Sequence, residues 1–253
     1  MSDQINKHQN TTKNDRKIMM KGSIWMTLST AISRSGSLIA QIILGLILVE
    51  EDFALYALAI STSTLIFTLK NGGARQLLIK NGENYNSVAS VYYKFAFIFN
   101  LTAMALLILI APAAAKIYGE DQISTLIYIV AISIPISTPA MLFRARLAIQ
   151  KRFGAIAKFD IASNLTRQAS MIALALSGYG AYSFVIPIVI VSIIEVAIGW
   201  WYVRSWPTSV KINRHKISNI IKDAKWIMIG SLAMGLSLQG DYLVIGRPIT
   251  AAS

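Results

Sequence analysis

Residues 89–112 read ASVYYKFAFIFNLTAMALLILIAP, an apolar block in which Lys94 is the only charged residue. Wound as a helix, a block of this length is long enough to cross a hydrocarbon core of about 30 Å. A segment surrounded by lipid must satisfy its own backbone hydrogen bonds, which a single apolar stretch can do only as a helix. This stretch therefore predicts an all-α integral membrane fold.

Comparable blocks recur along the chain, which is 55% hydrophobic and only 14% charged, against about 25% charged in a soluble domain. About seven to eight transmembrane helices are expected, at 23–49, 54–78, 89–112, 122–147, 155–177, 181–203 and 224–240, with an eighth starting at Asp241. Residues 1–22, rich in Asn, Gln, Lys and Thr, are expected to be a disordered cytoplasmic tail. Residues 204–223 are expected to form a basic cytoplasmic connection.

Positive charge falls in every second connection between these spans. One face collects the lysines and arginines of 7–21, 70–80, 144–158 and 204–225, whereas the opposite face holds Lys116 with Glu50, Glu51, Asp52, Glu120 and Asp121. Positively charged loops stay in the cytoplasm, so the N-terminus is predicted to be cytoplasmic. The net charge of +12 is thus a topology signal, and no nucleic acid partner is expected. The chain has no cysteine, and no metal, cofactor or catalytic group is expected.

Several spans carry polar residues every three to four positions, which places them on one face of a helix. They are Ser23, Thr27, Thr30, Arg34, Ser37 and Gln41; Ser61, Thr64, Thr68, Asn71 and Arg75; Asp160, Ser163, Asn164 and Arg167; and Ser192 and Glu195. Serine and threonine also serve close helix packing. An ionisable group at mid-membrane costs at least about 2.5–3.5 kcal/mol, so it needs an ion-pair partner or a hydrated cavity. Both explanations are open; arginines in a shared cavity would attract a pyrophosphate or an acidic sugar.

Three prolines lie inside expected spans: Pro135 and Pro139 in the fourth and Pro187 in the sixth. Each removes a backbone donor and can kink its helix. The kinks either adjust the shape of the bundle or serve as flexing points for alternating access.

Short motifs occur in a fixed order from Lys21 onward. They are Lys21-Gly22-Ser23-Ile24-Trp25, Glu50-Glu51-Asp52-Phe53-Ala54-Leu55-Tyr56-Ala57, Asn71-Gly72-Gly73-Ala74, Gln150-Lys151-Arg152-Phe153-Gly154, Gly178-Tyr179-Gly180-Ala181-Tyr182-Ser183-Phe184-Val185 and Gly240-Asp241-Tyr242-Leu243-Val244-Ile245-Gly246-Arg247. Together they resemble the polysaccharide (O-antigen) flippase branch of the multidrug/oligosaccharidyl-lipid/polysaccharide exporter superfamily. Members have 12 to 14 spans in two lobes. The resemblance implies that 23–203 form the N-terminal lobe, and that 224–253 are the truncated start of the second.

The resemblance further implies a bacterial inner-membrane transporter, not an enzyme. It would flip an undecaprenyl-pyrophosphate-linked oligosaccharide for lipopolysaccharide or other surface polysaccharide, among membrane lipids and with polysaccharide polymerase or assembly proteins as partners. From the polar faces and the last motif, two sets of site residues are hypothesised. The substrate-binding set is Arg34, Gln41, Asn71, Asn164 and Arg167; the ion- or proton-coupling set is Asp160, Glu195 and Asp241.

Three other functions remain open. A drug exporter of the same superfamily would need an acidic cavity for cationic drugs, whereas the polar faces here carry both signs. A membrane glycosyltransferase or polymerase could use Glu50, Glu51 and Asp52 as a base or as metal ligands. The outward loops, however, are too short to hold acceptor sugars. The third alternative is an inactive remnant of a truncated transporter.

Overall fold

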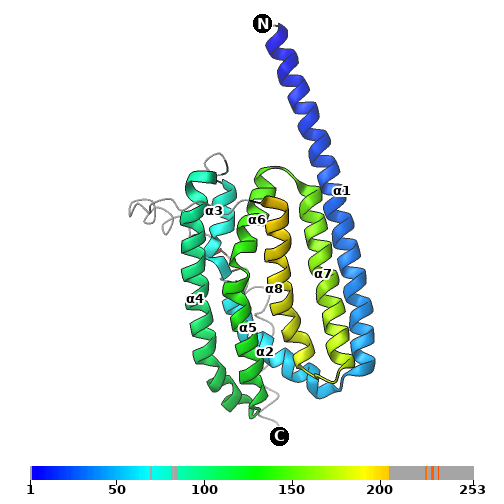
Figure 1. Ribbon diagram of the computed structural model, residues 1–253, viewed down its shortest axis with the longest axis vertical. Coiled ribbons are helices and arrows are strands. Elements are labelled where there is room, and N and C mark those ends of the chain that lie inside the picture. The colour runs from blue at the N-terminus through cyan, green and yellow to red at the C-terminus, as the bar shows by residue number, and fades with distance from the viewer. Residues whose placement is uncertain are drawn as a thin grey trace.

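The computed structural model describes residues 2–68, 70–80, 82, 85–204, 226, 229, 230 and 233. This part of the chain is helical throughout, without strands (Figure 1). Its elements are α1 (Ser2–Ile47), α2 (Glu50–Thr68), the 3-10 helix η1 (Lys70–Gly73), α3 (Ala74–Lys80), α4 (Tyr85–Tyr118), α5 (Gln122–Ile136), α6 (Thr138–Ile149), α7 (Phe153–Leu176) and α8 (Tyr182–Val203). The predicted all-α membrane fold is confirmed.

In the described part, three helical stretches are long and apolar enough to cross a membrane: Met20–Ile47, Val88–Tyr118 and Tyr182–Val203. Helices α5 and α6 meet this criterion together as a fourth, bent span. Helix α2 begins with three acids and α7 carries a polar face, so neither is apolar enough, although both run beside the others. Of the expected seventh span only four residues are described. Asp241, the expected start of an eighth, lies outside the described residues.

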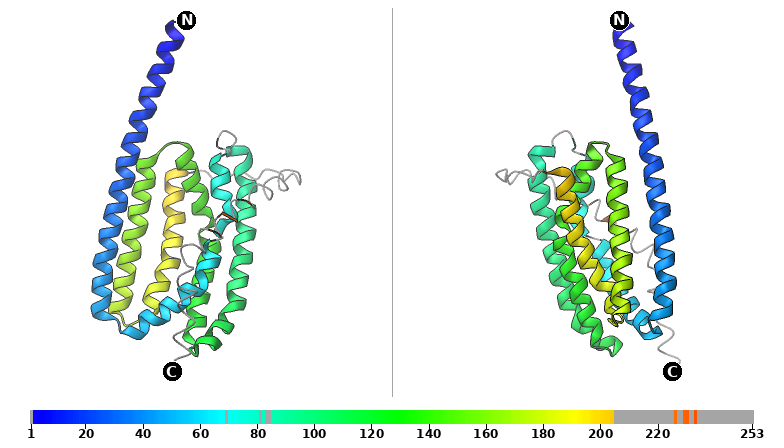
Figure 2. Two further views of the ribbon diagram at one scale, coloured as in Figure 1. Left: turned by 180° about the vertical axis from the view of Figure 1, so that it is seen from behind. Right: turned by 45° about the vertical axis from the view of Figure 1, so that its right-hand side comes forward.

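Helix α1 begins at Ser2, whereas residues 1–22 are expected from their composition to be disordered. In the structure residues 2–22 continue the first span as one helix that projects beyond the bundle (Figures 1 and 2). The stretch 2–21 contains neither proline nor glycine, so nothing in it breaks a helix once the following span supplies a nucleus. A polar composition indicates that a segment has no hydrophobic core to pack on. Such a segment can still be helical when it extends an adjacent helix.

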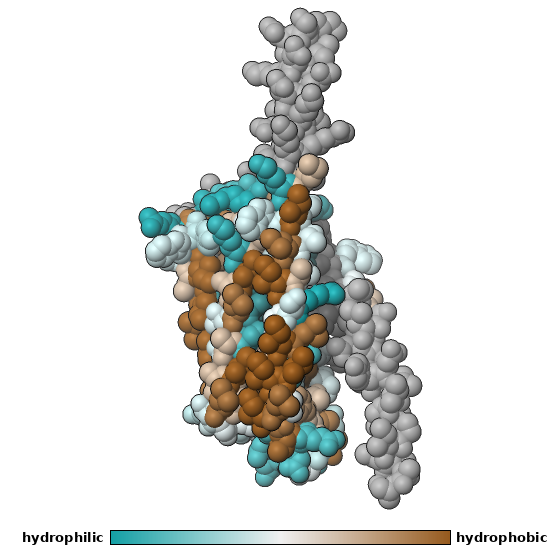
Figure 3. All heavy atoms as spheres, turned by 90° about the vertical axis from the view of Figure 1, so that its right-hand side faces the viewer, coloured by the Kyte–Doolittle hydropathy of each residue, from teal (hydrophilic) through white to brown (hydrophobic). Residues whose placement is uncertain are grey.

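The two ends of the bundle carry opposite charge. The end that holds Lys80, Lys151, Arg152 and Arg204, here called the basic end, lies opposite the acidic end, which holds Glu50, Glu51, Asp52, Glu120 and Asp121. Between them, the face shown in Figure 3 presents a band of hydrophobic side chains with hydrophilic groups above and below. This distribution is that of a bundle surrounded by lipid at mid-height, with water at both ends.

Three hydrophobic clusters hold the helices together. The first, toward the acidic end, joins α2, α4, α5 and α8 around Leu107, Leu126 and Ile127. The second joins α3, α4 and α6 at the basic end. The third joins α1, α7 and α8 through Leu44 and Phe184. Helix α1 therefore sits at the edge of the bundle, packed on α7 (Figure 1).

Helices α5 and α6 meet at Ser137 with a bend of 45°. Pro135 lies within α5, and Pro139 in the first turn of α6 cannot donate to the preceding turn. The carbonyl of Ile134 at the break accepts hydrogen bonds from Ser137 Oγ (2.8 Å) and from Asn100 Nδ2 (3.5 Å). The predicted kink in the fourth span is thus confirmed, whereas Pro187 lies within the continuous helix α8.

Two glycines lie where a phenylalanine of a neighbouring helix packs against the helix backbone. A Cβ added at Gly22 would lie 2.6 Å from Phe153 Cδ2, and one at Gly199 would lie 2.3 Å from Phe143 Cδ2. The first contact brings α1 against the start of α7 and the second brings α8 against α6. Without a side chain at either position, a phenylalanine ring packs directly on the helix backbone, in space that any other residue would fill.

Candidate functional site

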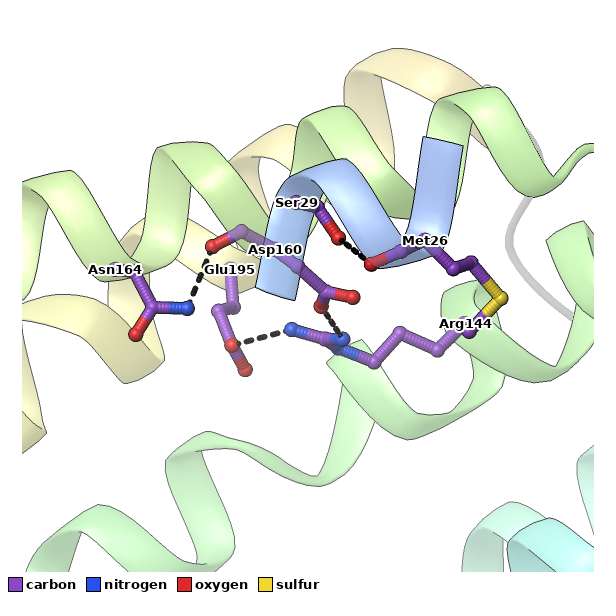
Figure 4. Close-up of polar contacts among 6 residues, drawn as sticks. All are labelled: Met26, Ser29, Arg144, Asp160, Asn164 and Glu195. Atoms are coloured by element: carbon purple, nitrogen blue, oxygen red, sulfur yellow. Dashed lines mark hydrogen bonds and ion pairs between the residues drawn. The ribbon is translucent and has the colours of Figure 1, made fainter. Parts of the chain in front are cut away.

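An ionic cluster lies inside the bundle, where α6, α7 and α8 meet (Figure 4). Arg144 of α6 donates one guanidinium nitrogen to Asp160 Oδ1 of α7 and the other to Glu195 Oε1 of α8, the latter at 2.7 Å. Its guanidinium also stacks over the Phe159 ring, 4.2 Å from the centroid. One arginine therefore joins three helices.

Burial makes this cluster energetically significant. The exposed fractions of the Arg144, Asp160 and Glu195 side chains are 19%, 31% and 20%. Mutual pairing offsets much of the cost of moving these charges away from water, and leaving one of them alone would restore that cost. Lys70 of η1 and Arg75 of α3 interact electrostatically with the same charges. Of these three cations, Arg144 is the one that forms ion pairs with the two acids.

A polar groove of about 390 Å³ lies beside this cluster, between α1 and α7. The two helices run in the same direction, because Gly22 meets Phe153 near the basic end and Leu44 meets Met171 farther along both helices. Their polar faces therefore lie side by side. The groove is lined by Ser29, Thr30, Ser33, Arg34, Ser37, Asp160 and Asn164.

The groove offers a cation and several hydroxyl groups to a ligand. Arg34 is exposed and forms no ion pair with any residue that the structure describes. Ser29 and Thr30 each donate to the carbonyl of Met26 at 2.9 Å, which leaves their oxygens able to accept hydrogen bonds. A ligand with a negative charge and hydroxyl groups matches these donors and acceptors.

The third hydrophobic cluster lies along α1 and α7 beyond the groove, toward the acidic end. Leu44 of α1, Met171 of α7 and Phe184 of α8 are buried there. Tyr56 of α2 stacks on Phe184 with ring centroids 4.5 Å apart. The polar lining therefore lies about midway along the α1–α7 contact, between the Gly22–Phe153 contact and this cluster.

The structure brings some of the hypothesised site residues together and separates others. Arg34, Asn164 and Asp160 meet at the groove, and Asp160 and Glu195 share Arg144. Gln41 is exposed and Arg167 is half-buried, and neither lines the groove. Asn71 belongs to η1, but its side chain lies outside the described part, as does Asp241 altogether.

Sequence reasoning missed Arg144, which it counted with Arg146 as a topology cation. A usable signal exists, because Arg144 lies within the apolar stretch 140–149, farther into the helix than Lys151 and Arg152. An arginine at that depth requires an acidic partner. Among the described residues, no three His, Cys, Asp or Glu side chains come together as a metal site would require.

Comparison with known proteins yields one match. The model of a family described as "polysaccharide biosynthesis protein" matches residues 19–253. No curated protein and no solved structure shows significant similarity to the chain.

Proposed function

The chain belongs to the polysaccharide biosynthesis protein family, and from this premise we propose that it flips a lipid-linked oligosaccharide across a bacterial inner membrane. The cargo would be a sugar repeat unit on undecaprenyl pyrophosphate, as in O-antigen synthesis. Family membership gives a role in polysaccharide biosynthesis, and the helices make the chain a membrane protein. Transport is the step in that process that requires a polar passage through the membrane.

The observation that carries the proposal is the groove between α1 and α7. It places hydroxyl groups, an amide and an arginine without an ion-pair partner among the described residues within a segment that otherwise faces lipid. A sugar offers many hydroxyl groups and a pyrophosphate offers charge, so the lining matches both parts of the cargo. Guanidinium groups bind phosphate oxygens through a planar fork of donors.

In this proposal, Arg34 and Asn164 bind the cargo directly. Gln41, Asn71 and Arg167 extend the polar path from the same or neighbouring helices. Arg144 is a positioning residue, because it fixes α7 relative to α6 and α8. We further propose Asp160 and Glu195 as coupling carboxylates. Protonating either one, or placing a cation beside it, would weaken its ion pair with Arg144 and loosen the helix that carries it, α7 for Asp160 and α8 for Glu195.

Orientation and partners follow from the same proposal. The basic end faces the cytoplasm, where the lipid-linked unit is made, so the groove is loaded from that side. No step of catalysis is assigned to the chain. Polysaccharide polymerase or assembly proteins would receive the unit at the acidic end.

Complementation of a flippase-deficient strain tests the proposal. The chain is expressed alone and with any downstream coding sequence restored, and surface polysaccharide is measured. We expect one of these forms to restore export. The Arg34→Gln variant of that form should insert normally into the membrane but should not export polysaccharide. Lys116→Gln, which removes a cation at the acidic end, is the matched control and should export normally.

Two outcomes would contradict it. A normal amount of surface polysaccharide in the Arg34→Gln variant would show that Arg34 in the groove is not needed for transport. Absence of export from both wild-type forms, with resistance to cationic drugs instead, would identify a drug exporter.

A further inference from the structure

Two grooves open at the basic end of α1, α7 and α8, away from the site described above. One, of about 380 Å³, is lined by Trp25, Arg152, Gly154, Ala155, Lys158 and Tyr202. The other, of about 400 Å³, is lined by Lys158, Ala162, Ala197, Ile198, Trp201 and Tyr202. They share Lys158 and Tyr202, and neither shares a lining residue with the Arg34 groove.

The first groove is basic. Arg152 and Lys158 are its charged residues, and no acid lines it. Both cations are exposed, and neither forms an ion pair within the described part of the chain. A Cβ added at Gly154 would meet nothing within 4 Å, so this wall leaves open space. The charge is therefore uncompensated by any residue that the structure describes.

The second groove is apolar. Ala162 of α7 and Ala197 of α8 are small, and they leave a depression that Ile198 and Trp201 border. Trp201 is 73% exposed, so a large ring stands out beside it. A depression of this shape between two helices suits a hydrocarbon chain.

The position of both grooves matches the membrane surface. Trp25 lies near the start of the first span, and Trp201 and Tyr202 lie near the end of the last one described. Tryptophan and tyrosine concentrate at the level of lipid headgroups. Lys158 lies six residues into α7 from Arg152, about 9 Å deeper along the helix, and its long stem can bring the ammonium group back toward that level.

We propose that the two grooves together bind one anionic glycerophospholipid. Its phosphate lies between Arg152 and Lys158, and an acyl chain follows the depression over Ala162 and Ala197. A basic groove between transmembrane helices on the cytoplasmic side is the chemistry that holds such headgroups. A zwitterionic lipid fills the same space but brings its own cation to the basic groove. This site is independent of the proposed transport function.

Quenching of tryptophan fluorescence by brominated lipid measures the binding. The full chain is placed in phosphatidylcholine nanodiscs that contain a small, fixed fraction of brominated phosphatidylglycerol or of brominated phosphatidylcholine. Stronger quenching by the brominated phosphatidylglycerol is expected, because Trp25 and Trp201 line the grooves. Equal quenching by both lipids would overturn the proposal.

Two sets of variants locate the site. Arg152→Gln with Lys158→Gln should lower the relative affinity for phosphatidylglycerol by about fivefold for each cation removed. Lys80→Gln with Lys116→Gln removes the same charge elsewhere and should leave that affinity unchanged. Ala197→Phe fills the depression without removing charge and should also reduce the excess quenching. Circular dichroism in the same nanodiscs checks that each variant is folded.

Competition identifies the source of the phosphate. Undecaprenyl pyrophosphate carries the same chemistry on a different lipid, so it is added to the phosphatidylglycerol sample. Retention of the excess quenching supports a phospholipid site. Its loss at low undecaprenyl pyrophosphate would assign the grooves to the transport cargo and overturn the proposal. Excess quenching that persists in both Arg152/Lys158 and Ala197 variants would place the lipid elsewhere. These results do not depend on whether the chain exports polysaccharide.

Discussion

Two polar regions of this bundle lie next to each other, and each places an arginine within the membrane-spanning part of the protein in a different way. In the ionic cluster, Arg144 is enclosed by three helices and paired with two carboxylates. In the groove, Arg34 is exposed and has no ion-pair partner among the described residues. Asp160 belongs to both regions, since it binds Arg144 and lines the groove.

The difference shows how to separate structural from functional charge in a membrane helix. A charge that is paired inside the protein holds helices together, and its removal affects stability first. A charge left unpaired at a cavity does little for the fold and is available to a ligand. Substitutions in the two regions should therefore change the free energy of unfolding by very different amounts.

Replacing Arg144 with methionine should have the largest effect. Asp160 and Glu195 would be left partly buried without a cation, at a cost of about 3–5 kcal/mol. Unfolding in detergent micelles measures the loss. The triple variant Arg144→Met, Asp160→Asn, Glu195→Gln should recover much of it, because neither buried carboxylate is then left without its cation. Failure of this variant to recover would mean that the loss comes from the missing ion pairs themselves, and not from carboxylates left without a cation.

Gly199→Ala should have an intermediate effect of about 1–3 kcal/mol. The new methyl group would overlap Phe143, which is fully buried and cannot move aside. Helix α8 would shift from α6 and draw Glu195, one helical turn away, from Arg144. Gly36→Ala in α1 is the control, because a Cβ there meets nothing within 4 Å. That variant should be unchanged or slightly more stable, and equal losses in both would contradict the packing argument.

Arg34→Gln should have the smallest effect, within about 0.5 kcal/mol of the parent chain. Its side chain is exposed and holds no described residue in place. The same micelle unfolding assay applies, and export should be lost despite normal stability. A large loss of stability would show that Arg34 is structural, and the contrast between the two regions would then fail.

Much of this bundle could be predicted from the sequence. The apolar blocks place α1, α2, α4, the α5–α6 pair, α7 and α8, because lipid permits only helices for such segments. Pro135 and Pro139 indicate the bend, since two prolines four positions apart remove two neighbouring backbone donors, whereas Pro187 alone leaves α8 continuous. The break between α2 and α3 at Lys70–Gly73 is less predictable, because the expected span 54–78 runs across it.

The candidate site could be predicted only in part. Helical spacing puts Arg34 on a polar face and Asp160 on another, but spacing within a helix does not say which helices become neighbours. The groove depends on α1 packing in parallel on α7, a contact between segments far apart in the chain. The pairing of Arg144 with Glu195 depends on Gly199 fitting against Phe143, which is a matter of shape. Both contacts depend on tertiary packing, which the spacing of residues within one helix does not predict.

The packing of α1 on α7 also has a consequence for the order of synthesis. Gly22 meets Phe153, about 130 positions later in the chain, so α1 leaves the ribosome long before its neighbour exists. At a synthesis rate of about 5–20 residues per second, α1 waits roughly 7–26 s. We therefore expect its polar face to be sheltered by the insertion machinery in that interval. Crosslinking from position 33 in stalled nascent chains should capture that machinery before α7 emerges and α7 afterwards; capture of lipid alone at the early stage would refute the idea.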